Sequence, residues 1–313
     1  MIIKDKVQLP FPHLKDIDVD LFIAASGYES RSTFIAKQLQ KYSIQRKIVF
    51  KFIDENSVSA RRLNDAYFEN DGYEQIDVDG DSNVEVRRFF NGVNWTSKFN
   101  WNIVVDYSVM TRVWYSAILE FIKCYNSAPI TINFYFCYSI SSFASSPKMD
   151  SYNIHIGPIR GFSNLTVPQK PTALIIGLGY ERNRAIGLSE YLDGETFVFY
   201  TDRSKEEKYS IEVENNNKEL IKQLKPNNIW KYPINDLNYL YRKLYTLCLD
   251  LADKFRVIIA PCGPKPFSLI SLLVALDLEN IDVWRISPGK SAPAIDKKAE
   301  GEVTMFFVST SAS

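Results

Sequence analysis

Short apolar runs alternate with longer amphipathic stretches along almost the whole chain. The runs are rich in Val, Ile and Phe, whereas the stretches between them repeat their apolar positions at the spacing of a helix. We therefore predict strands near 19–25, 47–53, 73–78, 101–106 and 130–136, and again near 172–177, 195–200, 228–232, 255–260 and 281–286. The predicted helices span 32–42, 57–69, 84–90 and 112–125, then 182–192, 207–224, 236–254 and 266–278.

Strands that are apolar throughout and alternate with helices indicate parallel sheets covered by helices on both faces. Because crossovers are right-handed, this alternation folds into a doubly wound, Rossmann-like sheet. We predict an α/β fold with two tandem Rossmann-like units, an N-terminal one over 1–145 and a C-terminal one over 172–313. Residues 146–171 are rich in Ser, Pro and Gly and are expected to form a linker. A last apolar run at 302–308 is expected to be an additional edge strand.

The two halves resemble each other in sequence. Gly-Tyr-Glu follows the first predicted strand of each half, at 27–29 and at 179–181, and an aspartate closes the second strand, Asp54 or Asp202. The matching segments occur in the same order and at a nearly constant separation. We therefore predict an internal duplication of one unit.

The loop after the fourth strand carries the strongest chemical signal. Arg112 in the first half and Lys265 in the second each stand at the start of an apolar helix. A cation is disfavoured at a helix amino terminus, where the peptide dipoles give a partial positive charge, and a bound anion would remove the conflict. The alternative is that the side chain extends to solvent.

The Gly-Tyr-Glu loops offer further ligand contacts. Their glycines permit close backbone approach, and nearby arginines could bind phosphate, whereas the glutamates could cap the helix or bind a ribose hydroxyl. A tight turn with an acidic residue is the alternative. The candidate binding residues of the two halves, taken together, are Gly27, Tyr28, Glu29, Arg31, Asp54 and Arg112, then Gly179, Tyr180, Glu181, Arg182, Asp202 and Lys265.

Several cofactor and catalytic motifs are incomplete. Gly177 and Gly179 supply two glycines of the dinucleotide fingerprint, but Arg182 stands in the third position, so no NAD or FAD is expected. Lys290 lies in a Pro-Gly-Lys-Ser segment without the Walker A spacing. Cys262 has no histidine near it in sequence, which argues against a nucleophile.

Composition narrows the choice further. The chain has 313 residues, with 37 Lys plus Arg and 37 Asp plus Glu, so its formal net charge is zero and duplex nucleic acid is not an expected partner. The four cysteines and two histidines are widely spaced, so we expect no metal site. No signal peptide or membrane-length apolar run is present, so a cytoplasmic location without a membrane partner is expected.

The paired units with these loops resemble the CARF and SAVED sensors of prokaryotic (anti-phage) defence systems. The resemblance is architectural and covers residues 20–290. It implies that the loops after strands one and four bind a cyclic oligonucleotide, and that both units lie in one chain as in SAVED domains. The chain differs from this family in having Gly-Pro-Lys-Pro at 263–266 instead of Gly-Gly-Thr-Lys.

Three functions are compatible with these observations. The first is binding of a nucleotide-like or phosphorylated small molecule, which would make the chain a sensor or regulatory component. The second is an enzyme that processes nucleotides or phosphoesters with Glu29 or Glu181 as general base. The third is a protein-interaction subunit with relic Rossmann sites and a partner encoded by a neighbouring gene.

Overall fold

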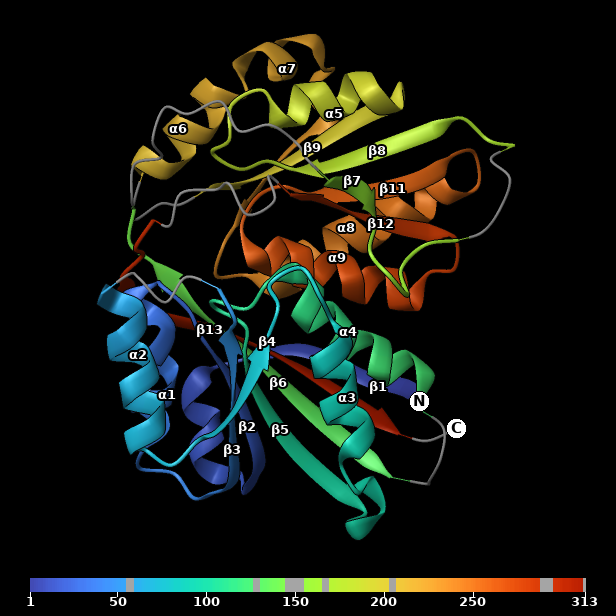
Figure 1. Ribbon diagram of the computed structural model, residues 1–313. Coiled ribbons are helices and arrows are strands. Elements are labelled where there is room, and N and C mark those ends of the chain that lie inside the picture. Colours follow the sequence, from blue (N-terminus) through green and yellow to red (C-terminus); the bar gives the residue numbers. More distant parts are fainter. Residues whose placement is uncertain are drawn as a thin grey trace. The chain divides into compact units, whose positions relative to one another are not determined.

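The computed structural model describes residues 1–54, 59–125, 130–143, 155–164, 169–202, 207–287 and 295–311. Its contacts divide the chain into two compact units (Figure 1). Unit 1 comprises Met1–Ala144 together with Ala294–Ser313, and unit 2 comprises Ser145–Pro293. The chain therefore leaves unit 1, forms unit 2 and returns to unit 1.

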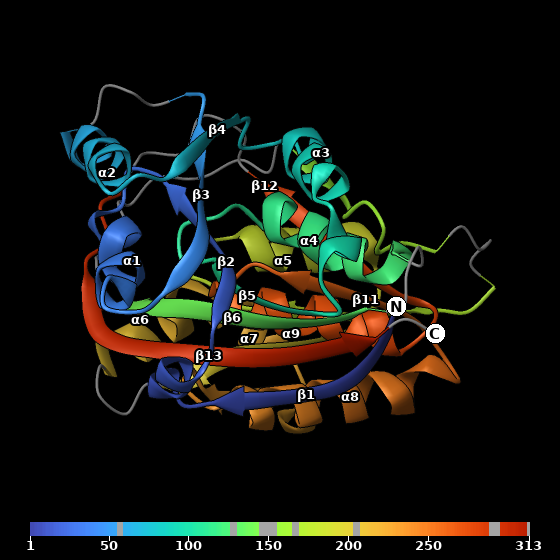
Figure 2. The same cartoon turned by 90° about the horizontal axis from the view of Figure 1, so that it is seen from below.

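Unit 1 is built on a seven-stranded sheet in the order β1-β13-β6-β5-β2-β3-β4. Strands β2 to β6 pair with one another in parallel, whereas β13 is antiparallel to both β1 and β6 (Figure 2). The strands are β1 (Ile2–Leu9), β2 (Val19–Ser26), β3 (Ile44–Phe52), β4 (Glu74–Val78), β5 (Asn100–Asp106), β6 (Thr131–Ser141) and β13 (Ala299–Ser311).

Helices cover both faces of this sheet, with α1 and α2 on one side and α3 and α4 on the other (Figure 1). The helices are η1 (Phe11–Asp16), η2 (Ser30–Thr33), α1 (Phe34–Leu39), α2 (Ser59–Asn70), α3 (Val84–Gly92), η3 (Trp95–Ser97) and α4 (Arg112–Cys124). Because both faces are buried, the central strands are apolar throughout rather than alternating.

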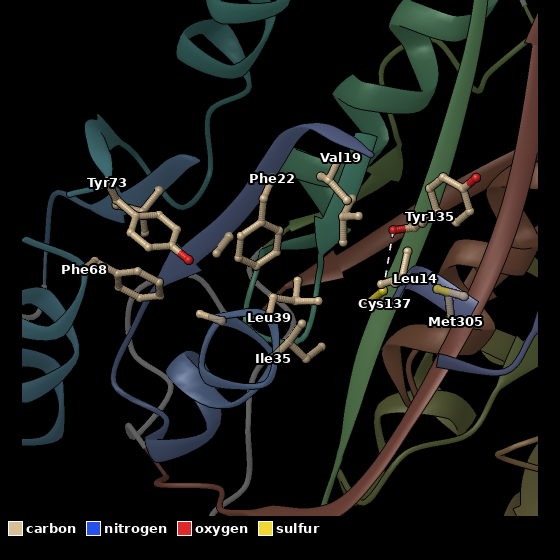
Figure 3. Packing of buried hydrophobic residues seen from close by; sticks show 14 residues of the cluster. Leu14, Val19, Phe22, Ile35, Leu39, Phe68, Tyr73, Tyr135, Cys137 and Met305 are labelled. Atoms are coloured by element: carbon tan, nitrogen blue, oxygen red, sulfur yellow. Dashed lines mark hydrogen bonds between the residues drawn. The ribbon is translucent and has the colours of Figure 1, made fainter. Parts of the chain in front are cut away.

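Successive residues of each central strand point alternately to the two faces of the sheet, and each face has a hydrophobic core. On the α1 face, Phe22 packs edge-on against Tyr73 with ring centroids 6.0 Å apart, inside a cluster that extends to Met305 of β13 (Figure 3). On the opposite face, Phe50 packs edge-on against Trp114 of α4, with ring centroids 6.2 Å apart. Burying such side chains stabilises the fold by about 1.5–3 kcal/mol each.

Unit 2 is built on a six-stranded sheet in the order β10-β9-β8-β11-β12-β7. The strands are β7 (His155–Pro158), β8 (Thr172–Gly177), β9 (Glu195–Asp202), β10 (Ile229–Pro233), β11 (Arg256–Pro261) and β12 (Ile281–Ser287). The helices are α5 (Arg184–Leu192), α6 (Glu207–Asn216), α7 (Lys218–Gln223), η4 (Pro226–Asn228), α8 (Leu237–Ala252) and α9 (Lys265–Asp277). Helices α5, α6 and α7 lie on one face of the sheet and α8 and α9 on the other (Figure 1).

The five parallel strands have the same spatial order in both units. Numbered along the chain within each unit, they lie in the order 3-2-1-4-5, which is the order of a Rossmann-like half. Each unit adds an antiparallel strand beside its fifth parallel strand, β13 beside β6 and β7 beside β12. The predicted α/β class with two Rossmann-like units is confirmed. The internal duplication stays a prediction that this shared order favours.

The expected limits of the units need correction. The run at 302–308 is not an edge strand of the C-terminal unit, because β13 lies between β1 and β6 in unit 1. The expected C-terminal unit over 172–313 therefore ends earlier, at Pro293. The expected linker over 146–171 contains β7, which extends the second sheet. An apolar strand pattern shows that a strand forms but not which sheet it joins, since that depends on distant partners.

Candidate functional site

Two helices begin with a cation at the carboxyl ends of the parallel strands. Helix α4 follows β5 and starts at Arg112, and helix α9 follows β11 and starts at Lys265. In each unit the preceding strand is the fourth and pairs with the first, so this is the place where the strand order reverses. Both side chains are half-buried and interact with other groups of the protein. The predicted placement of the two cations is confirmed.

Arg31 in the Gly-Tyr-Glu loop of unit 1 is an internal clamp. Its Nε donates to the carboxylate of Glu29 at 2.6 Å, and its two terminal nitrogens donate to the carbonyls of Ser139 at 2.6 Å and Ser108 at 3.1 Å. The guanidinium carbon lies 5.0 Å from the ring centroid of Tyr138. One side chain thereby joins the loops that follow β2 and β5 to strand β6.

This arrangement changes the expected role of Arg31. The side chain is only 2% exposed and is paired with Glu29, so it is not placed to meet a ligand from solvent. Burial alone would lower the pKa of Arg31, but the neighbouring Glu29 and Tyr138 raise it above its ordinary value. The guanidinium is therefore charged at every physiological pH, and its charge is balanced by Glu29 within the protein.

Unit 2 contains a related ion pair with a shifted position. Arg184, which is 5% exposed, lies 2.9 Å from the carboxylate of Glu181. Arg182, the expected phosphate ligand, is exposed and precedes α5. The counterpart of Arg31 is therefore Arg184, and Arg182 remains accessible to a ligand.

A pair of asparagines that the sequence analysis missed fixes both Gly-Tyr-Glu loops. In unit 1 the amide of Asn64 donates to the carbonyls of Gly27 at 2.8 Å and Glu29 at 3.0 Å. In unit 2 the amide of Asn217 donates to the carbonyl of Gly179 at 2.9 Å. Asn64 follows its glycine by 37 residues and Asn217 by 38, and this common spacing was the signal that could have identified them.

The asparagine contact leads to a stability prediction. Asn217 is buried and also donates to the carbonyl of Val213 at 2.8 Å, so Asn217→Ala leaves two carbonyls without this donor. We expect the free energy of unfolding to fall by about 2 kcal/mol, measured by urea denaturation. The exposed Asn215, two residues earlier in α6, gives the control, because Asn215→Ala removes no hydrogen bond that the structure shows. Equal effects of both substitutions would contradict a specific role of Asn217.

Three glycines of unit 2 lie where a side chain would clash with a neighbouring segment. A Cβ at Gly179 would lie 2.5 Å from the carbonyl oxygen of Cys262, and one at Gly263 would lie 2.2 Å from that of Leu178. A Cβ at Gly177 would lie 2.4 Å from the ring of Phe267. The loops after β8 and β11 are therefore packed against each other. At Gly27 in unit 1, a Cβ would meet only side chains, that of Phe52 at 3.3 Å and that of Val109 at 3.8 Å.

The remaining candidates lie around this edge with different exposure. Asp54 and Asp202 are exposed at the ends of the second parallel strands, and the carbonyl of Asp54 accepts from the fully buried Arg61 at 3.1 Å. Tyr28 and Tyr180 are half-buried. Lys290 lies outside the described residues, as do 55–58 and 203–206, which follow the two aspartates.

The described ranges hold no group of three His, Cys, Asp or Glu side chains that could bind a metal ion. Cys137 and Cys248 are buried, and burial raises the pKa of both thiols, which disfavours the reactive thiolate. No helix in the described ranges has the length and apolarity needed to cross a membrane.

Comparisons with known proteins add little to this picture. No protein-family model and no curated protein matches the chain. A solved structure described as the "Crystal structure of the cytoplasmic domain of a prokaryotic cation chloride cotransporter" aligns with 88% of this chain and 98% of its own, at 9% identity and a TM-score of 0.24. A TM-score this low supports no conclusion about fold or function.

Proposed function

We propose that each unit binds a nucleotide or another phosphorylated small molecule outside the carboxyl ends of its parallel strands. One repeated observation carries the proposal, namely a cation as the first residue of the apolar helix after the fourth parallel strand. Arg112 and Lys265 add their charge to the partial positive charge of the α4 and α9 amino termini. An oxyanion at either position would gain both interactions.

The surroundings of the two cations favour a nucleotide over a simple anion. In sheets of this order, nucleotides bind where the first and fourth strands diverge. An exposed carboxylate at the end of the second strand, Asp54 or Asp202, stands where such proteins hold a ribose hydroxyl. The half-buried Tyr28 and Tyr180 offer rings for stacking on a base. The asparagine and arginine contacts hold the adjoining loops in place before a ligand arrives, which lowers the entropy cost of binding.

A sensor or regulatory role fits the geometry better than catalysis by the two glutamates. The carboxylate of Glu29 is buried and accepts a hydrogen bond from Nε of Arg31, and the carboxylate of Glu181 is paired with Arg184. A general base must instead reach a proton of the substrate. We therefore propose a nucleotide sensor, with cyclic oligonucleotides of a defence system as its first candidate ligands.

Titration of the whole chain with nucleotides tests the proposal. We expect at least one of AMP, ATP and cyclic di- or trinucleotides to bind, and Arg112→Ala or Lys265→Ala to weaken binding about tenfold or more, because each removes a charge-assisted contact. Isothermal titration calorimetry measures both effects. Lys15→Ala and Lys225→Ala, which change exposed lysines elsewhere, serve as controls.

Two results would count against the proposal. The first is an intact chain that binds none of these nucleotides. The second is affinity that stays unchanged in the Arg112→Ala and Lys265→Ala double variant, since binding would then take place elsewhere.

A further inference from the structure

A short segment of the chain is bound to the Gly-Tyr-Glu loop of unit 1. It consists of residues 295–298, which return the chain to unit 1 immediately before β13, and we call it the strap. The carboxylate of Asp296 in the strap accepts two hydrogen bonds from Ser30, the residue that follows Gly-Tyr-Glu. One comes from the backbone nitrogen and one from Oγ, and each is 2.6 Å long. The donors of this residue therefore already hold an anionic group, which the protein itself supplies.

The strap is fastened by hydrogen bonds at the surface. The backbone nitrogen of Arg31 donates to the carbonyl of Lys297 at 3.2 Å, and that of Ser142 donates to the carbonyl of Lys298 at 3.0 Å. Residues 295–298 belong to no helix or strand, and both Asp296 and Ser30 are exposed. Because water competes for exposed hydrogen bonds, these contacts contribute little net stability. A ligand that offers stronger acceptors can therefore replace them.

The Gly-Tyr-Glu loop is held in place by contacts that do not involve the strap. The amide of Asn64 donates to the carbonyls of Gly27 and Glu29, and the guanidinium of Arg31 is paired with the carboxylate of Glu29. The side chains of Asn64, Glu29 and Arg31 are all buried. The two donors of Ser30 should therefore keep their positions when Asp296 leaves, so that an incoming anion meets a preformed pair of donors.

The equivalent position in unit 2 carries a cation. Arg182 follows Gly-Tyr-Glu there, as Ser30 does in unit 1, and its side chain is exposed. A guanidinium is well suited to bind phosphate or carboxylate. Both loops thus offer an anion a favourable partner at the same position. In unit 1 this partner is already occupied by Asp296.

We propose that the strap is an autoinhibitory segment, in which Asp296 stands in for a phosphate group of the ligand on the Gly-Tyr-Glu loop of unit 1. This inference rests on the proposed function and adds regulation to it. A ligand phosphate takes the two hydrogen bonds of Ser30 and displaces the strap, which also loses its contacts with the amides of Arg31 and Ser142. The chain returns from unit 2 to unit 1 through the strap, so binding alters the connection between the two units.

Titration of the whole chain with inorganic pyrophosphate, followed by NMR at the amide of Ser30, tests the strap. Asp296→Ala removes the competing carboxylate. We expect this variant to bind pyrophosphate about tenfold more tightly than the unmodified chain, because the strap no longer has to be released first. Asp296→Asn keeps the size of the side chain but not its charge, and its affinity should be intermediate. Glu69→Gln neutralises an exposed carboxylate of α2 and should leave the affinity unchanged.

Hydrogen exchange in the unmodified chain distinguishes displacement of the strap from binding beside it. The amides of Arg31 and Ser142 donate to carbonyls of the strap. Saturating pyrophosphate should therefore make their exchange about tenfold faster. The amide of Ser30 should stay protected, because the phosphate replaces Asp296 as its acceptor.

Three results would overturn the strap proposal. The first is equal pyrophosphate affinity in the unmodified chain and Asp296→Ala, and the second is exchange at Arg31 and Ser142 that pyrophosphate leaves unchanged. The third is the absence of any response of the Ser30 amide in every variant. If nucleotide binding is nevertheless weakened by Arg112→Ala, the strap proposal fails alone and the proposed function stands. If neither nucleotides nor pyrophosphate bind, both fail.

Discussion

Replacing Arg31 by methionine is expected to lower the free energy of unfolding by about 3–5 kcal/mol, as is usual when one partner of a buried ion pair is removed. Methionine keeps most of the length of the side chain but supplies no donors. Glu29, only 6% exposed, would keep a charge without its cation, and the carbonyls of Ser139 and Ser108 would lose their donors. Urea denaturation of the whole chain measures the loss, and hydrogen exchange at 106–109 and 138–140 locates it in unit 1.

Two further variants separate the buried charge from the loss of packing. Glu29→Gln combined with Arg31→Met should be less destabilising than Arg31→Met alone, because no charge is then left buried. Arg46→Met breaks a pair with Glu74 whose side chains are about half exposed, and should cost about 0–1 kcal/mol. If Arg31→Met were no less stable than Arg46→Met, the buried contacts of Arg31 would not stabilise the folded protein.

The strands were predictable because their environment leaves a simple mark on the sequence. A parallel strand covered on both faces must be apolar at consecutive positions, as Ile103, Val104 and Val105 are in β5. The ten predicted strands accordingly match β2 to β6 and β8 to β12. Strand β1 escaped prediction because it is at the edge, where the polar run Lys4, Asp5 and Lys6 is tolerated.

Long-range partners explain what the sequence could not show. Strand β13 is readable as a strand, yet its position depends on β1 and β6, which lie far away in the chain. The same holds for Arg31, whose acceptors at Ser108 and Ser139 lie 77 and 108 residues away. A basic residue beside a glycine loop has the same appearance in sequence whether it binds phosphate or a carbonyl of its own protein.

The repeated Gly-Tyr-Glu segment was the most informative local signal in the sequence. In both Gly-Tyr-Glu segments the glutamate is buried or half-buried and pairs with an arginine that follows the segment, Glu29 with Arg31 and Glu181 with Arg184. The two loops therefore share a similar internal ion pair. Arg112 and Lys265 differ in position from these arginines, because each is the first residue of a helix, α4 or α9.

Substituting Gly263 by alanine is expected to destabilise unit 2 by about 3 kcal/mol, at the upper end of the usual cost of overpacking. The new methyl group would lie 2.2 Å from the carbonyl oxygen and 2.9 Å from the carbonyl carbon of Leu178. Both atoms belong to the backbone, so no side-chain rotation can relieve the clash. The loops after β8 and β11 must separate instead, which also displaces Lys265 two residues later. Urea denaturation and nucleotide titration of the same variant measure the two consequences.

Gly187 provides a control with the opposite expected sign. It lies inside α5, and a Cβ there would meet no heavy atom within 4 Å, so Gly187→Ala should stabilise the protein by about 0.5–1 kcal/mol through the better helix propensity of alanine. If Gly263→Ala were instead as stable as Gly187→Ala, the two loops could not be in the close contact described. Ligands would then have room between the loops at the switch point. With the contact intact, the proposed ligand would lie outside the loop pair, near Lys265 and the exposed Arg182.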